Sequence, residues 1–141
     1  RHELSTDPAE LEACFHVLHD PANIAAPPAS GSWLHAGMIV CPCSMASLAA
    51  IATGVGTNLV HRAADVTLKE RRPLILVPRE TPLSEIHLEN MLRAQRAGAV
   101  IMPPCPGFYH RPETIEQLVA QFTGRILEQL DLPHELYTRW S

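Results

Sequence analysis

The chain has 141 residues, of which 46% are hydrophobic and 18% are charged. This composition is typical of one globular domain over residues 1–141 and excludes a disordered or fibrous chain. The 11 basic and 15 acidic side chains give a net charge of −4, which excludes a general basic surface for nucleic acid.

The N-terminal region predicts a helix and then a loop. Residues 8–18 place three apolar side chains on one helical face: Leu11, Phe15 and Leu18. Residues 24–32 are rich in Pro, Ala and Ser and have no hydrophobic period, so we expect an irregular loop there.

The next region predicts a strand followed by two helices. Residues 37–41 form a short apolar run, as a strand covered on both faces would, and Pro42 is expected to end it. Ser44 is suited to cap a helix that ends at Gly54. Residues 58–71 then show a helical period.

The C-terminal half repeats the alternation of strand and helix. Residues 74–77 and 99–102 are apolar strands, and Ser84 caps the helix between them. Residues 113–130 have the clearest helical period, carried by Ile115, Leu118, Val119, Phe122, Ile126, Leu127 and Leu130. Such alternation predicts an α/β fold with a parallel sheet, whose ligands bind beyond the carboxyl ends of the strands.

Three loops follow the predicted strands and therefore meet at that edge: residues 43–47, 77–82 and 103–110. The first begins a helix, whose free N–H groups suit an anion, although most serine caps bind nothing. In the second, Arg79 and Glu80 either form a structural ion pair or bind an anion and relay a proton. In the third, Tyr109 either packs over the sheet edge or donates its hydroxyl to an anion.

Three further cations leave two interpretations open. Arg125 lies beside the apolar stripe of the last helix, where it either reaches inward or faces solvent. Arg62 and Lys69 are seven residues apart and serve either an anion or the solvation of their helix.

The cysteines and histidines indicate no metal site. Cys14, Cys41, Cys43 and Cys105 fit neither a disulfide framework nor a zinc ribbon, so we expect reduced, buried thiols in a cytoplasmic protein. The eight histidines have no repeated ligand spacing. No apolar run approaches the ~20 residues of a membrane span.

Six sequence blocks together resemble one protein family. They are residues 41–45 (CPCSM), 62–65 (RAAD), 68–73 (LKERRP), 76–80 (LVPRE), 86–91 (IHLENM) and 106–109 (PGFY). Their order and spacing resemble those of the UbiX-like flavin prenyltransferases, formerly described as 3-octaprenyl-4-hydroxybenzoate or aromatic acid decarboxylases. The resemblance covers the chain from about residue 24 to its end.

The resemblance implies a fold and an activity. The fold is a Rossmann-like flavoprotein, with helices on both faces of a parallel sheet and subunits assembled as a dodecamer. Family members transfer dimethylallyl from dimethylallyl phosphate to N5 and C6 of reduced FMN, without a metal. The prenylated flavin then serves a UbiD-type decarboxylase, usually in ubiquinone biosynthesis.

The resemblance also implies roles for particular residues. The helix start that contacts FMN corresponds to Ser44, Met45, Ala46 and Ser47, and Arg79 matches a flavin-contacting arginine. Tyr109 and Arg125 match the residues that hold the dimethylallyl phosphate. Other polar residues around that phosphate, some from a neighbouring subunit, correspond to Arg62, Lys69 and Glu80. Trp140 matches a tryptophan near the site. Either Glu80 or the released phosphate takes the ring proton.

One part of the family pattern is missing from these 141 residues. The family begins with a strand, a Gly-Ala-Ser-Gly turn that cradles the FMN phosphate, and a second strand. We therefore expect that the N-terminal βα segment is lacking. Two alternatives remain: a flavin-free oligomeric form without activity, and a related flavin-dependent cysteine decarboxylase.

Overall fold

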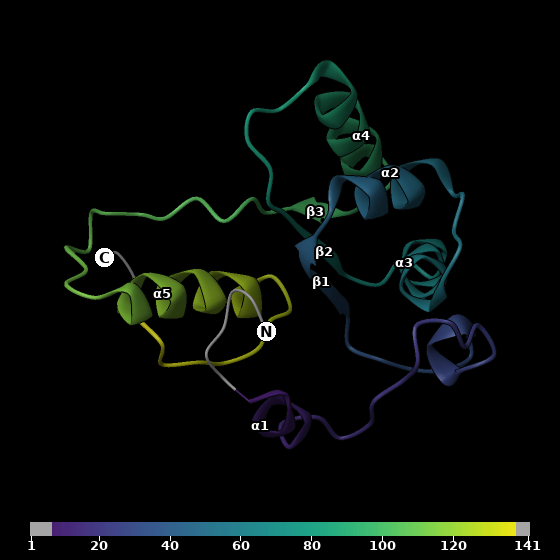
Figure 1. The fold of residues 1–141 in the computed structure, drawn as a ribbon, viewed down its shortest axis with the longest axis horizontal. Coiled ribbons are helices and arrows are strands. Elements are labelled where there is room, and N and C mark those ends of the chain that lie inside the picture. Colours follow the sequence, from purple (N-terminus) through teal and green to yellow (C-terminus); the bar gives the residue numbers. More distant parts are fainter. Residues whose placement is uncertain (1–6, 138–141) are drawn as a thin grey trace.

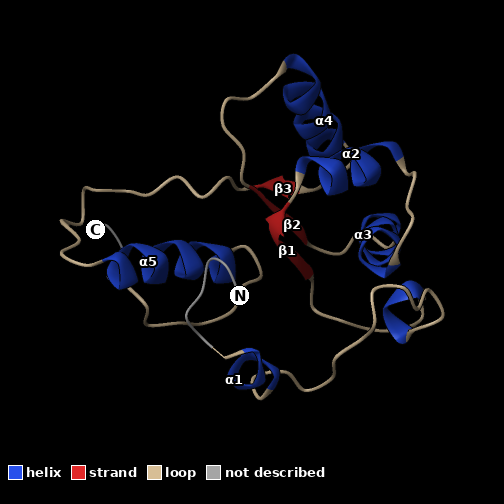
Figure 2. Cartoon of the chain, in the orientation of Figure 1, coloured by secondary structure: helices blue, strands red, loops and turns tan. Residues whose placement is uncertain are grey.

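The computed structural model describes residues 7–137 and contains a three-stranded parallel sheet. Its strands, β1 (Met38–Cys43), β2 (Leu74–Pro78) and β3 (Val100–Ile101), lie in the order β1-β2-β3. Figure 2 shows this small sheet at the centre, with helices around it. The α/β fold predicted from the alternating pattern is therefore confirmed.

Helices cover both faces of the sheet, as expected (Figure 1). The helices are α1 (Pro8–Glu12), the 3-10 helix η1 (Pro27–Ala29), α2 (Met45–Thr53), α3 (Leu59–Lys69), α4 (Glu85–Arg96) and α5 (Ile115–Glu128). One core cluster joins β1 and β2 to α2, α3 and α4, and a second joins β2 to α5. Within the described residues, no helix is long and apolar enough to cross a membrane.

Strand β2 is buried along its whole length because it is the middle strand and both its faces are covered. Successive side chains of a strand point to opposite faces. Leu74 and Leu76 therefore join the cluster with α2 and α4, whereas Ile75 and Val77 pack towards α5. This arrangement explains why the segment has no alternation of polar and apolar residues.

Side-chain caps fix where the helices begin. The hydroxyl oxygens of Ser44 and Ser84 accept backbone N–H groups in the first turns of α2 and α4, as predicted. Asn58 and Thr114 cap α3 and α5 in the same way. Gly54 ends α2 with φ of 72°, in the left-handed region where glycine is favoured.

Because the Ser84 cap satisfies a backbone donor, replacing Ser84 with alanine is expected to lower the free energy of unfolding by about 1 kcal/mol. Urea denaturation of the two proteins measures this difference. Ser84→Asp keeps an acceptor at the cap and serves as the control. If Ser84→Ala and Ser84→Asp unfold at the same urea concentration, the cap does not stabilise α4.

Some predicted boundaries and faces are wrong. The first helix ends at Glu12 instead of residue 18, and Phe15 and Leu18 are exposed. Phe15 and Leu18 lie beyond the end of α1, and a single helical turn is unstable without tertiary packing. Pro42 does not end β1, because the register shifts between Val40 and Cys43 and a bulge tolerates proline.

Two apolar helix faces are less buried than their sequence patterns indicate. The last helix is shorter than the predicted 113–130, and only its second half packs on the sheet: Ile126 is buried, whereas Ile115 and Val119 are exposed. On α4, the apolar side chains Ile86 and Leu92 are also exposed.

Candidate functional site

The carboxyl ends of the three strands carry the three predicted loops along one edge of the sheet. A cavity of about 370 Å³ lies between the loop after β3 and helix α5. A second cavity, of about 630 Å³, lies between this loop and the end of β2. Both are lined by Pro103 and Cys105, so the loop after β3 separates two adjoining halves of one site.

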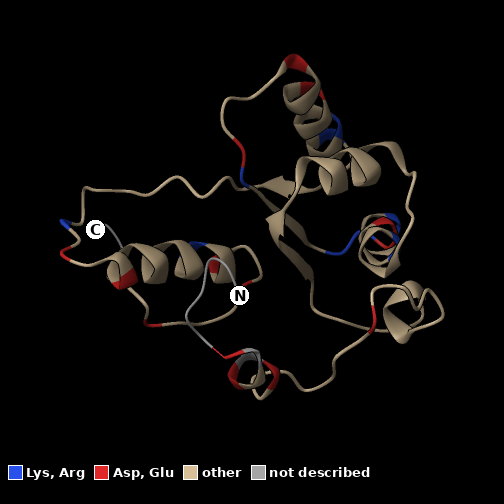
Figure 3. Cartoon of the chain, viewed as in Figure 1, with Lys and Arg blue, Asp and Glu red and all other residues tan. Residues whose placement is uncertain are grey.

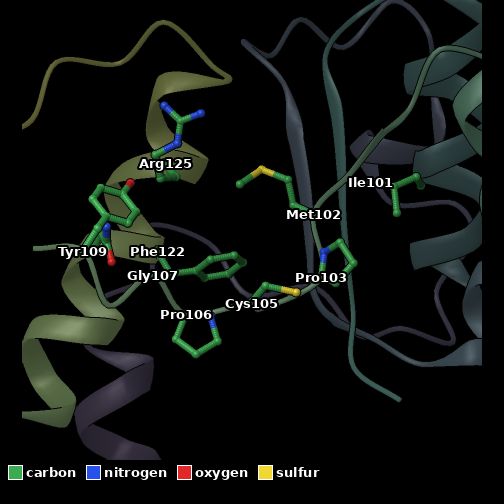
Figure 4. A pocket seen from close by; sticks show the side chains of 10 residues that line it. Ile101, Met102, Pro103, Cys105, Pro106, Gly107, Tyr109, Phe122 and Arg125 are labelled. Atoms are coloured by element: carbon green, nitrogen blue, oxygen red, sulfur yellow. The ribbon is translucent and has the colours of Figure 1, made fainter. Parts of the chain in front are cut away.

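The first cavity brings Tyr109 and Arg125 together, as the family resemblance implies. Met102 and Phe122 form an apolar part of its lining (Figure 4). Arg125 comes from α5 and Tyr109 from the loop, so two separate elements supply the polar groups. The cavity thus combines a cation and a phenol with an apolar wall.

Arg125 is held by residues further along the chain. Its guanidinium forms an ion pair with Glu128, whose carboxylate also accepts the Tyr137 hydroxyl at 2.8 Å. A hydrogen bond with Tyr137 is the main cause that raises the pKa of Arg125, and the Glu128 charge adds to it. Arg125 therefore stays charged while its side chain is half exposed beside the cavity.

The second cavity contains Arg79 and Glu80, which follow β2 directly. In Figure 3 a basic stretch of ribbon is followed by an acidic one in the loop that leads from the sheet to α4. Both residues are exposed, and the Glu80 carboxylate accepts the backbone N–H of Thr81 at 3.0 Å. Buried strand β2 thus presents a guanidinium and a carboxylate at the edge where a ligand is expected.

The third part of the edge is the start of α2, after β1. Ser44 accepts the Ser47 N–H, and its hydroxyl donates to Ser47 Oγ, both at 3.1 Å. Met45 packs against the core, and Ala46 is exposed. Sequence reasoning missed His61 of α3, whose Nε2 lies 3.2 Å from Ser47 Oγ. Only the packing of α3 on α2 reveals this contact.

The structure does not bring Arg62 and Lys69 to this edge within one chain. Arg62 of α3 pairs with Asp65 at 2.8 Å and lines a separate cavity between α2 and α3. Lys69, at the end of α3, pairs with the neighbouring Glu70. Their contact with a ligand stays a prediction that needs a neighbouring subunit, and Trp140 lies outside the described residues.

The cysteines are free, but only Cys43 is buried, contrary to the expectation that all four are. Cys14, Cys41 and Cys105 are exposed because they lie in loops or on the edge of the sheet. Burial raises the pKa of Cys43 to about 11. Over residues 7–137, no group of three or more His, Cys, Asp or Glu side chains is placed to hold a metal ion.

The raised pKa of Cys43 predicts selective thiol chemistry. At pH 8 a thiol with a pKa of about 11 is a thiolate in about one molecule in a thousand. Iodoacetamide is therefore expected to modify Cys14 and Cys105 in the native protein and to leave Cys43 unmodified. Peptide mass spectrometry checks this, with protein unfolded in urea as the control. Equal labelling of Cys43 and Cys105 in the native protein would contradict the burial of Cys43.

The fold and this edge define a class, the α/β flavoproteins. A family model described as Flavoprotein matches residues 6–127. The flavin prenyltransferase UbiX of Alkalihalophilus pseudofirmus is 52% identical over 99% of this chain and 68% of its own length. The UbiX of Pseudomonas aeruginosa is 57% identical over 82% of this chain and 56% of its own length.

Two solved structures extend the comparison. The crystal structure of AnUbiX (PadA1) in complex with FMN and dimethylallyl pyrophosphate has a TM-score of 0.97 and 51% identity, over 99% of this chain and 74% of that one. A dodecameric FMN-dependent UbiX-like decarboxylase from Escherichia coli O157:H7 has a TM-score of 0.93 and 48% identity, over 99% of this chain and 75% of that one. This chain belongs to the UbiX family of flavin prenyltransferases.

The chain is shorter than these relatives. It spans 68% of the Alkalihalophilus protein and 56% of the Pseudomonas protein. The sequence lacks the Gly-Ala-Ser-Gly turn that the resemblance places in the N-terminal part of the family. The edge that the structure describes is built from the ends of β1, β2 and β3.

Proposed function

We propose that the protein is a flavin prenyltransferase, which transfers dimethylallyl from dimethylallyl phosphate to N5 and C6 of reduced FMN. The observation that carries this proposal is the pair of adjoining cavities, which places Tyr109 and Arg125 on one side of the loop after β3 and Arg79 and Glu80 on the other. Cations and hydroxyl donors beside an apolar wall suit a phosphate attached to a prenyl chain.

The residues present also fit FMN. The start of α2 supplies a serine hydroxyl and the backbone N–H groups of its first turn before Ser47, and Arg79 supplies a guanidinium, which together suit the carbonyl and nitrogen atoms of a flavin ring. We propose that Ser44, Met45, Ala46, Ser47 and Arg79 hold it. When bound, reduced FMN supplies the two nucleophilic positions that accept the prenyl group.

The side chains around the first cavity act on the leaving group. As the bond between dimethylallyl C1 and the phosphate oxygen breaks, negative charge grows on the phosphate. The fixed charge of Arg125 and the hydroxyl of Tyr109 stabilise that charge more in the transition state than in the ground state. Met102 and Phe122 exclude water from the allylic carbon. Glu80 or the released phosphate accepts the ring proton.

Assembly is part of the same proposal. Ile86, Leu88 and Leu92 of α4 expose apolar surface, which supports contact with further copies of the chain. In a homo-oligomer such as a dodecamer, Arg62 and Lys69 of one subunit would then reach the phosphate held by another. We place the protein in the cytoplasm, where free cysteines persist, and a UbiD-type decarboxylase would receive its product.

A flavin-free oligomeric form is the second candidate, because the exposed apolar side chains of α4 suit contact between copies whether or not flavin is bound. Visible absorbance of the protein purified with excess FMN separates the two candidates. The proposal predicts flavin that stays bound through gel filtration. Protein that elutes without flavin would favour the second candidate. Turnover with dimethylallyl phosphate and with dimethylallyl pyrophosphate then identifies the donor.

A further inference from the structure

A buried histidine lies behind the start of α2. His61 belongs to α3 and is only 9% exposed. Its Nδ1 lies 3.3 Å from the backbone nitrogen of Thr57, and its Nε2 lies 3.2 Å from Ser47 Oγ. Buried polar atoms in proteins are almost always hydrogen-bonded, and both nitrogens of this ring have a partner.

These contacts fix which ring nitrogen carries the proton. The backbone N–H of Thr57 can only donate, so Nδ1 must accept. In a neutral imidazole the other nitrogen is then protonated, and Nε2–H donates to Ser47 Oγ. The neighbouring Ser44 hydroxyl also donates to that oxygen, at 3.1 Å.

One hydrogen-bonding group of Ser47 is therefore still available to a ligand. A serine oxygen has two lone pairs, and both accept a hydrogen bond here, from His61 and from Ser44. The Ser47 backbone N–H is already bound to Ser44 Oγ. The remaining group is the Ser47 O–H, and two donors on its oxygen make it a stronger donor.

We infer that His61 is a positioning residue that turns the Ser47 hydroxyl into a hydrogen-bond donor towards an acceptor atom of the bound flavin ring. Ser47 is half-buried in the first turn of α2, directly after the carboxyl end of β1, on the edge where the flavin is proposed to bind. The inference rests on the proposed function, because it needs flavin at this edge.

The tautomer can be measured without flavin. In the flavin-free protein, ¹⁵N NMR of the histidine rings is expected to show His61 protonated at Nε2 and unprotonated at Nδ1. Ser47→Ala removes the acceptor and should move the Nε2 signal while leaving Nδ1 bonded to Thr57. A ring protonated at Nδ1 would overturn the inference, because Ser47 would then donate to the histidine and not to a ligand.

The effect on flavin is tested in the intact protein with FMN. His61→Leu and Ser47→Ala are each expected to weaken FMN binding about fivefold, the equivalent of one hydrogen bond. Both should shift the visible absorption band of bound FMN in the same direction. Together they should have no larger effect than either alone, because they remove one shared interaction.

Two more variants serve as controls: one conservative replacement of His61 and one replacement of a different histidine. His61→Gln retains an N–H donor towards Ser47 and should restore the wild-type spectrum, even if His61→Leu is poorly folded. His16→Leu changes an exposed histidine and should alter nothing. If His61→Leu keeps the wild-type spectrum and the wild-type affinity for FMN, the inference about His61 is overturned and the proposed function is not. A wild-type protein that binds no FMN would instead overturn the proposed function, and the role of His61 with it.

Discussion

Replacing Arg79 with alanine is expected to slow the formation of prenylated FMN by about two to three orders of magnitude, because the flavin loses a fixed guanidinium that orients its ring, an effect of the size found when one positioned donor is removed from an active site. Arg79 follows buried strand β2 and lines the cavity beside Glu80, so its guanidinium is carried by a rigid element. Single-turnover measurement with reduced FMN and dimethylallyl phosphate gives this rate. Tyr109→Phe, which removes the hydroxyl from the adjoining cavity, is expected to slow the reaction strongly as well.

Folding and assembly should be unaffected by these changes. Arg79 and Tyr109 are exposed at the edge of the sheet, away from the core clusters. Arg96→Ala, which removes an exposed arginine from the end of α4, is the matched control and should keep the wild-type rate. A wild-type rate in Arg79→Ala or Tyr109→Phe would contradict the site assignment.

Replacing Leu76 with alanine is expected to lower the free energy of unfolding by about 2–5 kcal/mol. Leu76 lies in the middle of β2, is fully buried and packs in the cluster that joins β1 and β2 to α2 and α4. The smaller side chain loses its burial and leaves a cavity. Because a domain of this size is stabilised by only about 5–15 kcal/mol, this loss is a large share of the total.

Urea denaturation of the variant and the wild type measures the Leu76 effect. Leu76→Met conserves most of the side-chain volume and should lower the free energy of unfolding by less than about 1.5 kcal/mol. It therefore distinguishes the effect of lost packing from the effect of any substitution at this position. A Leu76→Ala protein within about 0.5 kcal/mol of the wild type would show that β2 is not the centre of the core.

The elements that could be predicted from the sequence are those set by local chemistry. The apolar run of β2 and the serine caps at Ser44 and Ser84 each depend on a few adjacent residues, and each is confirmed. The failed predictions depend on tertiary packing. Phe15 has a helical spacing but lies beyond the end of α1 with an exposed side chain, and β1 continues through Pro42 because of a bulge.

The functional site also divides into residues that the local sequence indicates and residues that only tertiary packing reveals. The place of Arg79 and Glu80 after a buried strand left a ligand site and a structural ion pair open, and the family resemblance favoured the ligand site. The structure puts both residues in a cavity that adjoins that of Tyr109 and Arg125. No sequence pattern indicated a role for His61, because its contact with Ser47 spans 14 residues and exists only once α3 packs on α2. Arg62 and Lys69 pair with Asp65 and Glu70 away from this edge, so no pattern in one chain predicts their role.

Mass spectrometry of the flavin after one reaction tests the central claim most directly. The intact protein is incubated with reduced FMN and dimethylallyl phosphate in the absence of oxygen, and the flavin is then extracted. The proposed function predicts FMN whose mass has increased by one prenyl unit, together with an equal amount of inorganic phosphate. FMN recovered unmodified, with neither phosphate released from dimethylallyl phosphate nor pyrophosphate released from dimethylallyl pyrophosphate, would contradict it.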